Sequence, residues 1–465
     1  MHDHSATLLT EHFLPTNITR ILDDAGIAFT THSLETIDPA LHVHHVLLED
    51  ADKKLLVIVP RTHIINLSQL NSTTDSTWRA AKSATVTALL ARLQLDQLPA
   101  LPQLLKLDSL CDPTVFTQPK AYLDSGIAGV VLALEPAALA RLLDSSQQLS
   151  CAEPITHHHP NHGCITSDTE TIQQAVVGLT SLRIHKRLEE TLEIPLLSST
   201  AKKIMRLRND NMAGVDELAA IVETDPALAA QVIAWASSPF YAAPGKIRSV
   251  EDAIARVLGF DLVINLALGL SLGKSLTLPA DQPQHAQPYW QQAIYTAALI
   301  EGLTRTMPMQ NKPEVGLTYL AGLLHNFGFA LLAHLFPPHY TLVCRSLEAN
   351  IHLSHSVIEY HLLGITREQM GAWLMQCWQI PDELVYALRH QDDPSYQGEH
   401  EVYANLTCLA QRLLLQHTRG LTTYNGIPEE LYQRLHLSAD SAQTTLQQVF
   451  DAEHALRALV AQFNQ

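Results

Sequence analysis

The sequence predicts a multidomain fold in which an α+β region comes first and an all-α region follows. In residues 1–150, short apolar runs bounded by charged turns, glycine or proline alternate with helical patterns. From about Leu182 onward, one helical pattern follows another to the end of the chain. The length of 465 residues is enough for two or three domains that each bury a core.

The strands of the first region are expected where apolar residues gather in short runs. "HHVLLED" and "KKLLVIVP" lie on either side of a charged turn and predict two neighbouring strands. "GIAGVVLALEP" is a further apolar run between glycine and proline, and it predicts another strand. The stretch "STWRAAKSATVTALLARL" between these runs has a helical pattern. Residues 1–150 are therefore expected to form one compact α+β domain.

The next segment, "CAEPITHHHPNHGCITSD" at 151–168, contains two prolines and a glycine and predicts a loop that opens a linker over 151–185. A structural zinc site normally shows ligand pairs two to four residues apart on both sides of a loop. His159 and His162 have such a spacing but the cysteines are far apart, so a His-rich linker is the prediction and a zinc site is the alternative. The possible ligands are Cys151, His157, His158, His159, His162 and Cys164.

The second region carries helix start and stop signals. In "DPALAAQVIAWAS", Asp225 is placed as an N-cap and Pro226 lies in the first turn. "SVEDAIARVLGF" has Ser249 and Asp252 at capping-box spacing and ends at Gly259. Similar patterns predict a helical domain over 186–416 and a helical C-terminal extension over 417–465.

Charge and hydropathy restrict the class of protein. Lys plus Arg is 30 and Asp plus Glu is 47, so the formal net charge is −17, which argues against charge-driven binding of nucleic acid. The start "MHDHSATLLTEHF" has no basic segment before an apolar one, so no secretory signal is predicted. We expect no apolar run to reach the ~20 residues of a membrane span, and the best candidate is "LVINLALGLSLG". A cytoplasmic protein without membrane contact is expected.

Several segments of the helical region resemble one known family. "IPLLSSTAKKIMRLRND", "LAAIVETDPALAAQVIAWASSPFY", "IRSVEDAIARVLGFDLVINLALGLSL" and "AGLLHNFGFALLAHLFP" occur in an order and at spacings similar to the HDOD family, the HD-related output domains of bacterial signalling proteins. The resemblance covers roughly residues 190–416. It implies an all-helical relative of the HD phosphohydrolases, usually without demonstrated catalysis, that accompanies sensor or regulatory modules.

The resemblance also implies where a metal site would lie. HD enzymes hold divalent metals with a first His, a His-Asp pair and a distant Asp. The matching positions here are Gln292, His325 with Asn326, and Gln411, so one of four ligands remains. Divalent metals at such sites need ionised carboxylates and neutral imidazoles, whereas amides are neutral but still hydrogen-bond. We expect a vestigial pocket of Gln292, His325, Asn326 and Gln411, with no metal, no cofactor and no catalytic residue.

Two further positions belong to the same implied site. Accessory histidines of related metal sites fall near Arg367 and Gln391, and neither residue is a histidine. The expected network of buried amides would bond internally or to backbone, because an unpaired buried polar group costs ~1–3 kcal/mol.

The first region is similar to the YbaK-like aminoacyl-tRNA editing deacylases over roughly residues 15–145. "VIVPRTHIINL" and "SGIAGVVLALEP" carry this resemblance. It implies a lysine in the strand occupied by "HHVLL", and that position falls at His45. It also implies a Gly/Pro-rich loop to frame the ester, but the comparable "LQLDQLPALPQLLKLDSL" has no glycine to offer backbone N–H donors. A degenerate domain, with His45 as its vestigial position, is expected.

Two other groups of charged or titratable residues were considered. Strand alternation is expected to place His42 and His44 on one face and His45 on the other, as solvated or core histidines. Lys202, Lys203, Arg206 and Arg208 share one helix in "AKKIMRLRND" and either meet a phosphate-bearing ligand or form a solvated face.

These observations favour a non-catalytic bacterial signal-transduction regulator that acts by binding a protein or ligand through its helical half. The expected partner is a protein of a signalling pathway. The alternative is a hydrolase, either a metal-dependent phosphohydrolase using the HD pocket or an aminoacyl-tRNA deacylase using the first domain.

Overall fold

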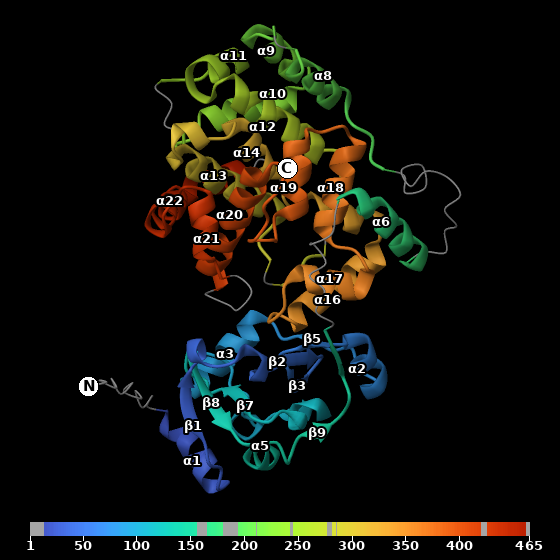
Figure 1. The fold of residues 1–465 in the computed structure, drawn as a ribbon, viewed down its shortest axis with the longest axis vertical. Helices are drawn as coiled ribbons and strands as arrows, with labels where there is room; N and C mark the ends of the chain where they lie inside the picture. Colours follow the sequence, from blue (N-terminus) through green and yellow to red (C-terminus); the bar gives the residue numbers. More distant parts are fainter. Residues whose placement is uncertain are drawn as a thin grey trace, which may run out of the picture. The chain divides into compact units, whose positions relative to one another are not determined.

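The structure is a computed structural model, and it describes residues 14–155, 165–179, 194–210, 212–241, 245–276, 281–284, 286–419 and 426–461. The chain divides into two compact units (Figure 1). Unit 1 consists of the described residues of Met1–His157, Pro283–His285 and Val343–Ser354, and unit 2 holds the rest. The expected order of an α+β region before an all-α region is confirmed.

Unit 1 is built around a five-stranded sheet with the order β5-β2-β3-β6-β9. Strands β2 and β3 form an antiparallel pair with Val46 opposite Val57, while β6 runs parallel to both β3 and β9. An antiparallel sheet of order β1-β8-β7 and a pair β10-β4 complete the strands. Their bounds are β1 Thr30–Ser33, β2 Val43–Asp50, β3 Lys53–Pro60, β4 His63–Ile65, β5 Arg79–Ala80, β6 Asp108–Cys111, β7 Ala121–Asp124, β8 Val130–Leu134, β9 Gln147–Gln148 and β10 Ala152–Pro154.

Apolar cores cover both faces of the β2–β3 pair. Leu56 and Ile58 join one core cluster, while Leu55 and Val57 join another. Burial on both faces explains why these strands appear in the sequence as continuous apolar runs rather than as an alternating pattern. The helices of unit 1 are α1 Thr16–Asp24, α2 Leu67–Thr74, α3 Ser83–Leu93, α4 Pro102–Leu105 and α5 Pro136–Leu142, with short 3-10 turns η1 Leu34–Thr36, η2 Pro39–Leu41 and η3 Pro113–Thr117.

A segment from late in the chain completes the core of unit 1. The Asn350 side chain accepts a hydrogen bond from Ile65 N at 2.7 Å and donates one to Ile65 O at 3.3 Å, as a neighbouring strand would. His352 Nε2 lies 2.9 Å from His63 O, and Ala349 belongs to the core cluster on that side. Residues 343–354 therefore belong to unit 1 although they follow the helical half in the sequence.

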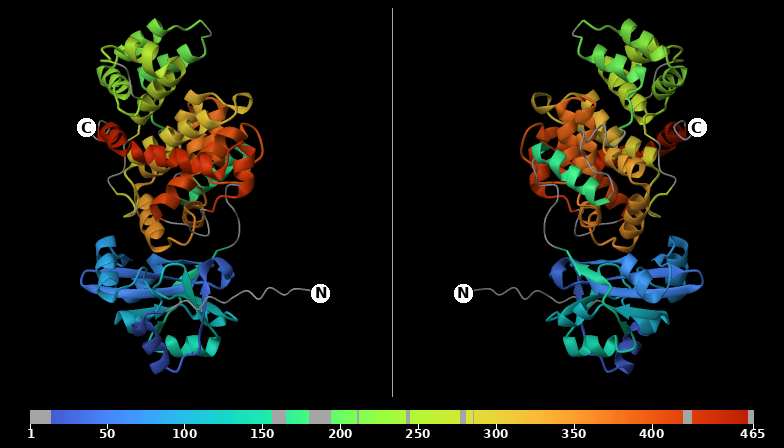
Figure 2. Two further views of the ribbon diagram at one scale, coloured as in Figure 1. Left: turned by 90° about the vertical axis from the view of Figure 1, so that its left-hand side faces the viewer. Right: turned by 90° about the vertical axis from the view of Figure 1, so that its right-hand side faces the viewer.

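Among the described residues of unit 2, the regular secondary structure consists of helices, and α8–α11 lie together at one end of the unit (Figure 2). The bounds are α6 Ile165–Leu179, α8 Ser199–Arg208, α9 Val215–Glu223, α10 Pro226–Ala236, α11 Val250–Ala253, η5 Ile254–Leu258, α12 Phe260–Gly273, α13 Tyr289–Thr306, η6 Met309–Asn311, α14 Val315–Leu324, α15 Phe327–Leu335, α16 Pro337–Ala349, α17 His355–Leu363, α18 Arg367–Cys377, α19 Asp382–His390, α20 Glu401–Arg419, α21 Glu429–Arg434, α22 Ala439–Asp451 and α23 Glu453–Ala461; the last part of α16 belongs to unit 1.

The apolar segment formed by α14 and α15 corrects one expectation. The segment Val315–Leu335 is long and apolar enough to cross a membrane, although no such run was expected. His325 and Asn326 form a two-residue turn between the two helices and interrupt the apolar letters, which hides the length of the segment in the sequence. Because 94% of its 18-residue window is buried within the protein, this segment has the properties of a core helix pair.

The range expected to be a linker contains regular structure. Strand β10 pairs with β4, and helix α6 packs against α18. Asp168 of α6 is buried and accepts hydrogen bonds from Arg389 Nε at 2.5 Å and from Gln369 Nε2 at 3.0 Å. The prolines and the glycine of the loop predict an irregular segment, and the helical pattern of α6 follows directly after them. The expected boundaries at residues 150, 185 and 416 remain predictions.

Candidate functional site

His325 and Asn326 lie at the junction between α14 and α15, where several helices converge. Two glycines allow this approach. A Cβ on Gly322 would overlap the backbone of Ala297 in α13, and a Cβ on Gly328 would overlap the backbone at Arg367, where α18 begins. Both residues of the His-Asn pair are consequently buried, at 7% and 5% exposure.

The amide of Asn326 joins two of the positions that the sequence singled out. Asn326 Nδ2 donates to Gln292 Oε1 at 3.3 Å, and Arg367 Nη1 donates to Asn326 Oδ1 at 3.2 Å. Gln292 Nε2 in turn donates to Gln287 O at 2.5 Å. The structure therefore brings Gln292 and Asn326 together and adds a guanidinium to them.

Arg367 has a buried counter-ion, Glu359 of α17. Glu359 is fully buried and accepts from Arg367 Nε at 2.6 Å and from the Arg367 backbone N–H at 2.8 Å. The guanidinium also lies over the Phe329 ring, with Cζ 3.8 Å from the centroid. Burial lowers the pKa of Arg367, but the Glu359 carboxylate outweighs this and raises it, so the side chain stays charged.

The other two expected residues are linked through Gln391. Gln411 Nε2 donates to Gln391 Oε1 at 2.6 Å, and Gln391 Nε2 donates to His325 O at 2.8 Å. His325 and Gln411 are thus connected by one intervening side chain. The four expected residues belong to two short hydrogen-bonded chains that meet at the His325–Asn326 backbone.

The imidazole of His325 is neutral near neutral pH. Its Nδ1 donates to Gly322 O at 2.7 Å, which leaves Nε2 without a proton. Burial lowers its pKa to about 4; the bond to Gly322 opposes this shift, and the Arg367 charge adds to it. A neutral imidazole can serve as a metal ligand, but it is the only such group among the four matching positions.

The residues present do not fit the divalent metal that HD enzymes hold. Gln292, Asn326 and Gln411 supply no negative charge, and Asn326 Oδ1 already accepts a bond from a guanidinium cation. Within the described ranges, no group of three or more His, Cys, Asp or Glu side chains is arranged to hold a metal ion. No chemical step can be derived through a metal at these positions.

The sequence did not reveal an ion pair beside this site. His355 Nε2 lies 2.7 Å from Glu368 Oε1, and Ser356 Oγ donates to Asp392 Oδ2 at 2.6 Å. Burial raises the pKa of Glu368, but His355 outweighs this and lowers it to about 2, while the pKa of His355 is raised. Nothing in the spacing of these residues along the chain indicated the pairing.

A second polar centre lies in unit 1 around Asp124. His42 Nε2 is 3.4 Å from Asp124 Oδ1, and His45 Nδ1 is 3.6 Å from Asp124 Oδ2. The expectation that His42 shares a face with His44 is wrong. His42 precedes strand β2 as the C-cap of η2, so strand alternation does not extend to it, and it turns to the same side as His45.

The protonation of His45 is constrained by its neighbours. His45 Nε2 lies 2.8 Å from Leu98 O and must donate to it, so in the neutral ring the Nδ1 lone pair faces the Asp124 carboxylate. Burial lowers the pKa of His45, and Asp124 opposes that shift. Burial also raises the pKa of Asp124, but the close approach of His42 Nε2 and the charges of His45, His42 and Arg61 outweigh it and lower the pKa.

His44 points to the other face of the strand and packs on the late segment of unit 1. Its ring stacks on His352 with centroids 3.6 Å apart, and its Nε2 lies 3.2 Å from Ala349 O. Burial lowers the pKa of both histidines, that of His352 to about 3. These are core histidines rather than solvated ones.

The expected His-rich loop falls mostly outside the described residues, including His157, His158, His159, His162 and Cys164. Cys151 is described and buried. Burial raises the pKa of its thiol to about 12, with the Asp112 charge as a further cause. The zinc alternative for this loop therefore stays a prediction.

Comparison with known proteins identifies relatives of both halves. The HDOD domain matches residues 194–394. A solved structure from Marinobacter aquaeolei VT8, described as a signal transduction protein, is 38% identical; the match covers 97% of this chain and 100% of that one, with a TM-score of 0.90.

Two more distant likenesses complete the comparison. An uncharacterized protein of Treponema pallidum (strain Nichols) is 23% identical over 266 residues, which are 56% of this chain and 50% of that protein, so the match spans about half the relative's length. A solved structure described as a trans-editing enzyme for prolyl tRNA synthetase matches the N-terminal region at 15% identity, covering 30% of this chain and 99% of its own, with a TM-score of 0.25. That likeness transfers no activity.

Proposed function

Because the chain belongs to the HDOD-domain proteins of signal transduction, we propose that it is a non-catalytic cytoplasmic regulator that works by binding. The bound molecule is a protein of its signalling pathway, and the helical unit is the half that recognises it. The helices around His325 and Asn326 form the rigid frame of that unit rather than a reaction centre.

One observation carries this proposal, the position of the Arg367 guanidinium. It donates to Asn326 Oδ1, the atom that would correspond to a metal-binding carboxylate oxygen in an HD enzyme. A second cation close to this oxygen would be repelled, and no carboxylate is present at the four matching positions to offset the repulsion. A two-metal hydrolytic mechanism needs metals held by such carboxylates.

The surrounding contacts support a structural role for the same residues. Gln292, Asn326, Arg367, Gln391 and Gln411 come from or adjoin five helical segments, and hydrogen bonds join them across those segments. Buried polar groups with all partners present rigidify a core and define one arrangement of its helices. A fixed helical frame presents a constant surface to a partner.

Turnover assays on the full-length, tag-free protein test the absence of catalysis. We expect no hydrolysis of bis-p-nitrophenyl phosphate or cyclic dinucleotides in the presence of manganese or iron, beyond what His325→Ala gives. Mischarged aminoacyl-tRNA should likewise be hydrolysed no faster than by His45→Ala. Activity that disappears in either variant would establish the hydrolase alternative and overturn the proposal.

A binding experiment tests the positive half of the proposal. Crosslinking of the full-length protein in its native cell, followed by mass spectrometry, should give a specific protein whose crosslinks map to the described residues of unit 2. Crosslinks confined to unit 1 would contradict the assignment of recognition to the helical unit.

A further inference from the structure

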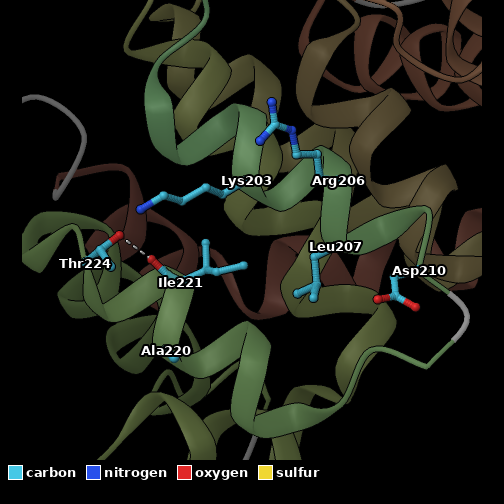
Figure 3. A pocket seen from close by; sticks show the side chains of 7 residues that line it. All are labelled: Lys203, Arg206, Leu207, Asp210, Ala220, Ile221 and Thr224. Carbon is cyan, nitrogen blue, oxygen red and sulfur yellow. Dashed lines mark hydrogen bonds between the residues drawn. The ribbon is translucent and has the colours of Figure 1, made fainter.

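A groove between α8 and α9 lies apart from the polar pocket. Lys203, Arg206, Leu207 and Asp210 line it from α8 and the turn that follows (Figure 3). Ala220, Ile221 and Thr224 line it from α9 and its C-cap. Its volume is about 520 Å³.

The sequence of α8 explains why two cations face this groove. Ser198 caps the helix by accepting from Ala201 N at 3.0 Å, and Ala201 and Ile204 are buried on the inner face. Lys203 and Arg206 are one helical turn apart on the outer face and both line the groove; the Lys203 side chain extends toward Thr224, whereas the Arg206 guanidinium lies at the edge of the groove (Figure 3). Because Ala201 and Ile204 are buried against the protein, the side of α8 that carries Lys203 and Arg206 faces outward.

Lys203 and Arg206 have no partner within the part of the chain that the structure describes. Neither side chain makes an ion pair or a hydrogen bond with any residue that the structure describes. By contrast, Arg208 on the same helix lies near Glu314 and contributes to the electrostatic environment of that carboxyl group. In a chain of net charge −17, two neighbouring unpaired cations beside apolar surface mark a place where an anionic group is favoured.

The one acidic residue among those that line the groove, Asp210, has one carboxylate oxygen engaged. Its Oδ1 accepts a hydrogen bond from Met212 N at 2.9 Å, which holds the turn after α8. Thr224 donates to Ile221 O at 2.6 Å, so its hydroxyl oxygen remains free to accept (Figure 3). The floor between the polar groups consists of Leu207, Ala220 and Ile221.

The shape of the groove favours a chain segment over a small molecule. Five of the seven lining residues are exposed and only Leu207 and Ile221 are half-buried. Pockets for small ligands enclose most of the ligand surface, whereas a furrow between two helices suits an amphipathic segment that lays its apolar side on the floor. The cations at the edge then meet acidic residues of that segment.

We propose that the α8–α9 groove docks an acidic amphipathic segment of a partner protein. The apolar residues of the segment contact Leu207 and Ile221, and its carboxylates pair with Lys203 and Arg206. The inference goes beyond the proposed function, because it names a surface and the chemistry of the occupant, and it does not depend on the pocket around His325.

Fluorescence anisotropy with the full-length protein and two labelled probes tests the proposal. Both probes are helical peptides of about 16 residues, roughly 24 Å long, with one leucine stripe. The positions beside the stripe are glutamate in one probe and lysine in the other. We expect the glutamate probe to bind, the lysine probe not to bind, and affinity to fall with added salt because the ion pairs are exposed.

Matched variants locate the binding site. The double variant Lys203→Glu/Arg206→Glu should weaken the glutamate probe by about tenfold or more. Lys202→Glu changes the same charge on an exposed residue of α8 that does not line the groove, and it should change the affinity by less than about twofold. Circular dichroism checks that all variants remain folded.

Several outcomes would overturn the proposal. They are absence of binding by the glutamate probe, equal weakening by Lys202→Glu, or displacement of the probe by inorganic phosphate at matched ionic strength, which would assign the groove to a small anion. Self-association that the double variant abolishes in analytical ultracentrifugation would make a second copy of the chain the occupant. None of these readouts involves turnover, so hydrolytic activity would refute the proposed function without affecting this result.

Discussion

The two polar centres of the molecule differ in how their buried polar side chains are paired. Around Asn326 in unit 2, neutral amides hydrogen-bond to one another and Glu359 neutralises the one cation, Arg367. Around Asp124 in unit 1, His42 Nε2 and His45 Nδ1 face a carboxylate without forming a hydrogen bond. The first centre is therefore stabilised by hydrogen bonds between groups that do not titrate, whereas the interactions in the second centre depend on which of its groups are protonated.

The two centres therefore respond differently to pH and to substitution. Amides do not titrate, so the bonds between them persist across the pH range, whereas a His–Asp centre consists of groups whose charge changes with pH. We therefore expect unit 2 to be sensitive to the removal of any partner, and the Asp124 centre to lose its stabilising contribution as pH falls.

The largest effect is expected from removing the buried counter-ion in unit 2. Glu359→Leu leaves the Arg367 guanidinium buried without its carboxylate, and breaking such a pair costs about 3–5 kcal/mol. Urea unfolding of the full-length protein, followed by tryptophan fluorescence, measures the loss. Glu223→Gln alters an exposed glutamate and should be within about 0.5 kcal/mol of wild type; a similar value for Glu359→Leu would mean that the pair is not buried in solution.

A smaller effect is expected from interrupting the amide chain. Asn326→Leu removes the acceptor of Arg367 Nη1 and the donor to Gln292 Oε1, which should cost about 1–3 kcal/mol. Asn326→Asp keeps an acceptor 3.2 Å from the guanidinium, so its charge is met by a cation and its cost should be smaller than that of the leucine variant. The reverse order of the two melting temperatures would contradict the described contacts.

Acidification should weaken unit 2 through His325. Its folded pKa of about 4 lies below the unfolded value of 6.5, so the folded state takes up fewer protons and loses stability as pH falls from 6.5 toward 4. At pH 5 this loss amounts to about 2 kcal/mol relative to pH 7. His325→Gln should lack this share of the pH dependence, and equal slopes for variant and wild type would show that His325 titrates normally.

The smallest effect is expected at Asp124. In Asp124→Asn the amide can donate to the Nδ1 lone pair of His45, so the change at pH 8 should be below about 1 kcal/mol. The pKa of Asp124 is lowered, so its stabilising contribution is present above the unfolded pKa and is lost as pH falls through the folded value. Protection of peptides from strands β2 and β7 in hydrogen exchange measures the effect locally; a large loss at pH 8 would show that Asp124 is indispensable as an anion.

The sequence predicted the features that local patterns determine. Strands β2, β3 and β8 occur where the apolar runs predicted them, and Asp225 and Ser249 cap their helices through Ala227 N and Asp252 N. Gln292 and Asn326, which the family resemblance placed in one pocket, form a direct hydrogen bond. The resemblance could predict this proximity because it includes information on tertiary structure that local patterns lack. Periodicity, capping chemistry and the order of the motifs were sufficient to predict these features.

Other features depend on contacts between distant segments and could not be predicted. Asn350 completes a strand edge 285 residues away, and nothing in its local sequence indicates this. In the sequence, Glu359 has no feature that indicates a buried ion pair; its contact with Arg367 is formed only in the folded structure. The sequence pattern assigns His42 to the strand that follows it. In the structure the preceding turn η2 sets its position as a C-cap, and the apolar run does not indicate this turn.

The proposed function requires that an arginine, rather than a metal, supplies the positive charge beside Asn326. Elemental analysis of the full-length, tag-free protein, purified and then incubated with manganese, iron or zinc before desalting, tests it most directly. Other histidines of the chain can bind metal weakly, so the decisive quantity is the difference between wild type and His325→Ala. We predict that the two proteins retain the same amount; one equivalent of metal per chain in the wild type that is lost in His325→Ala would contradict the claim.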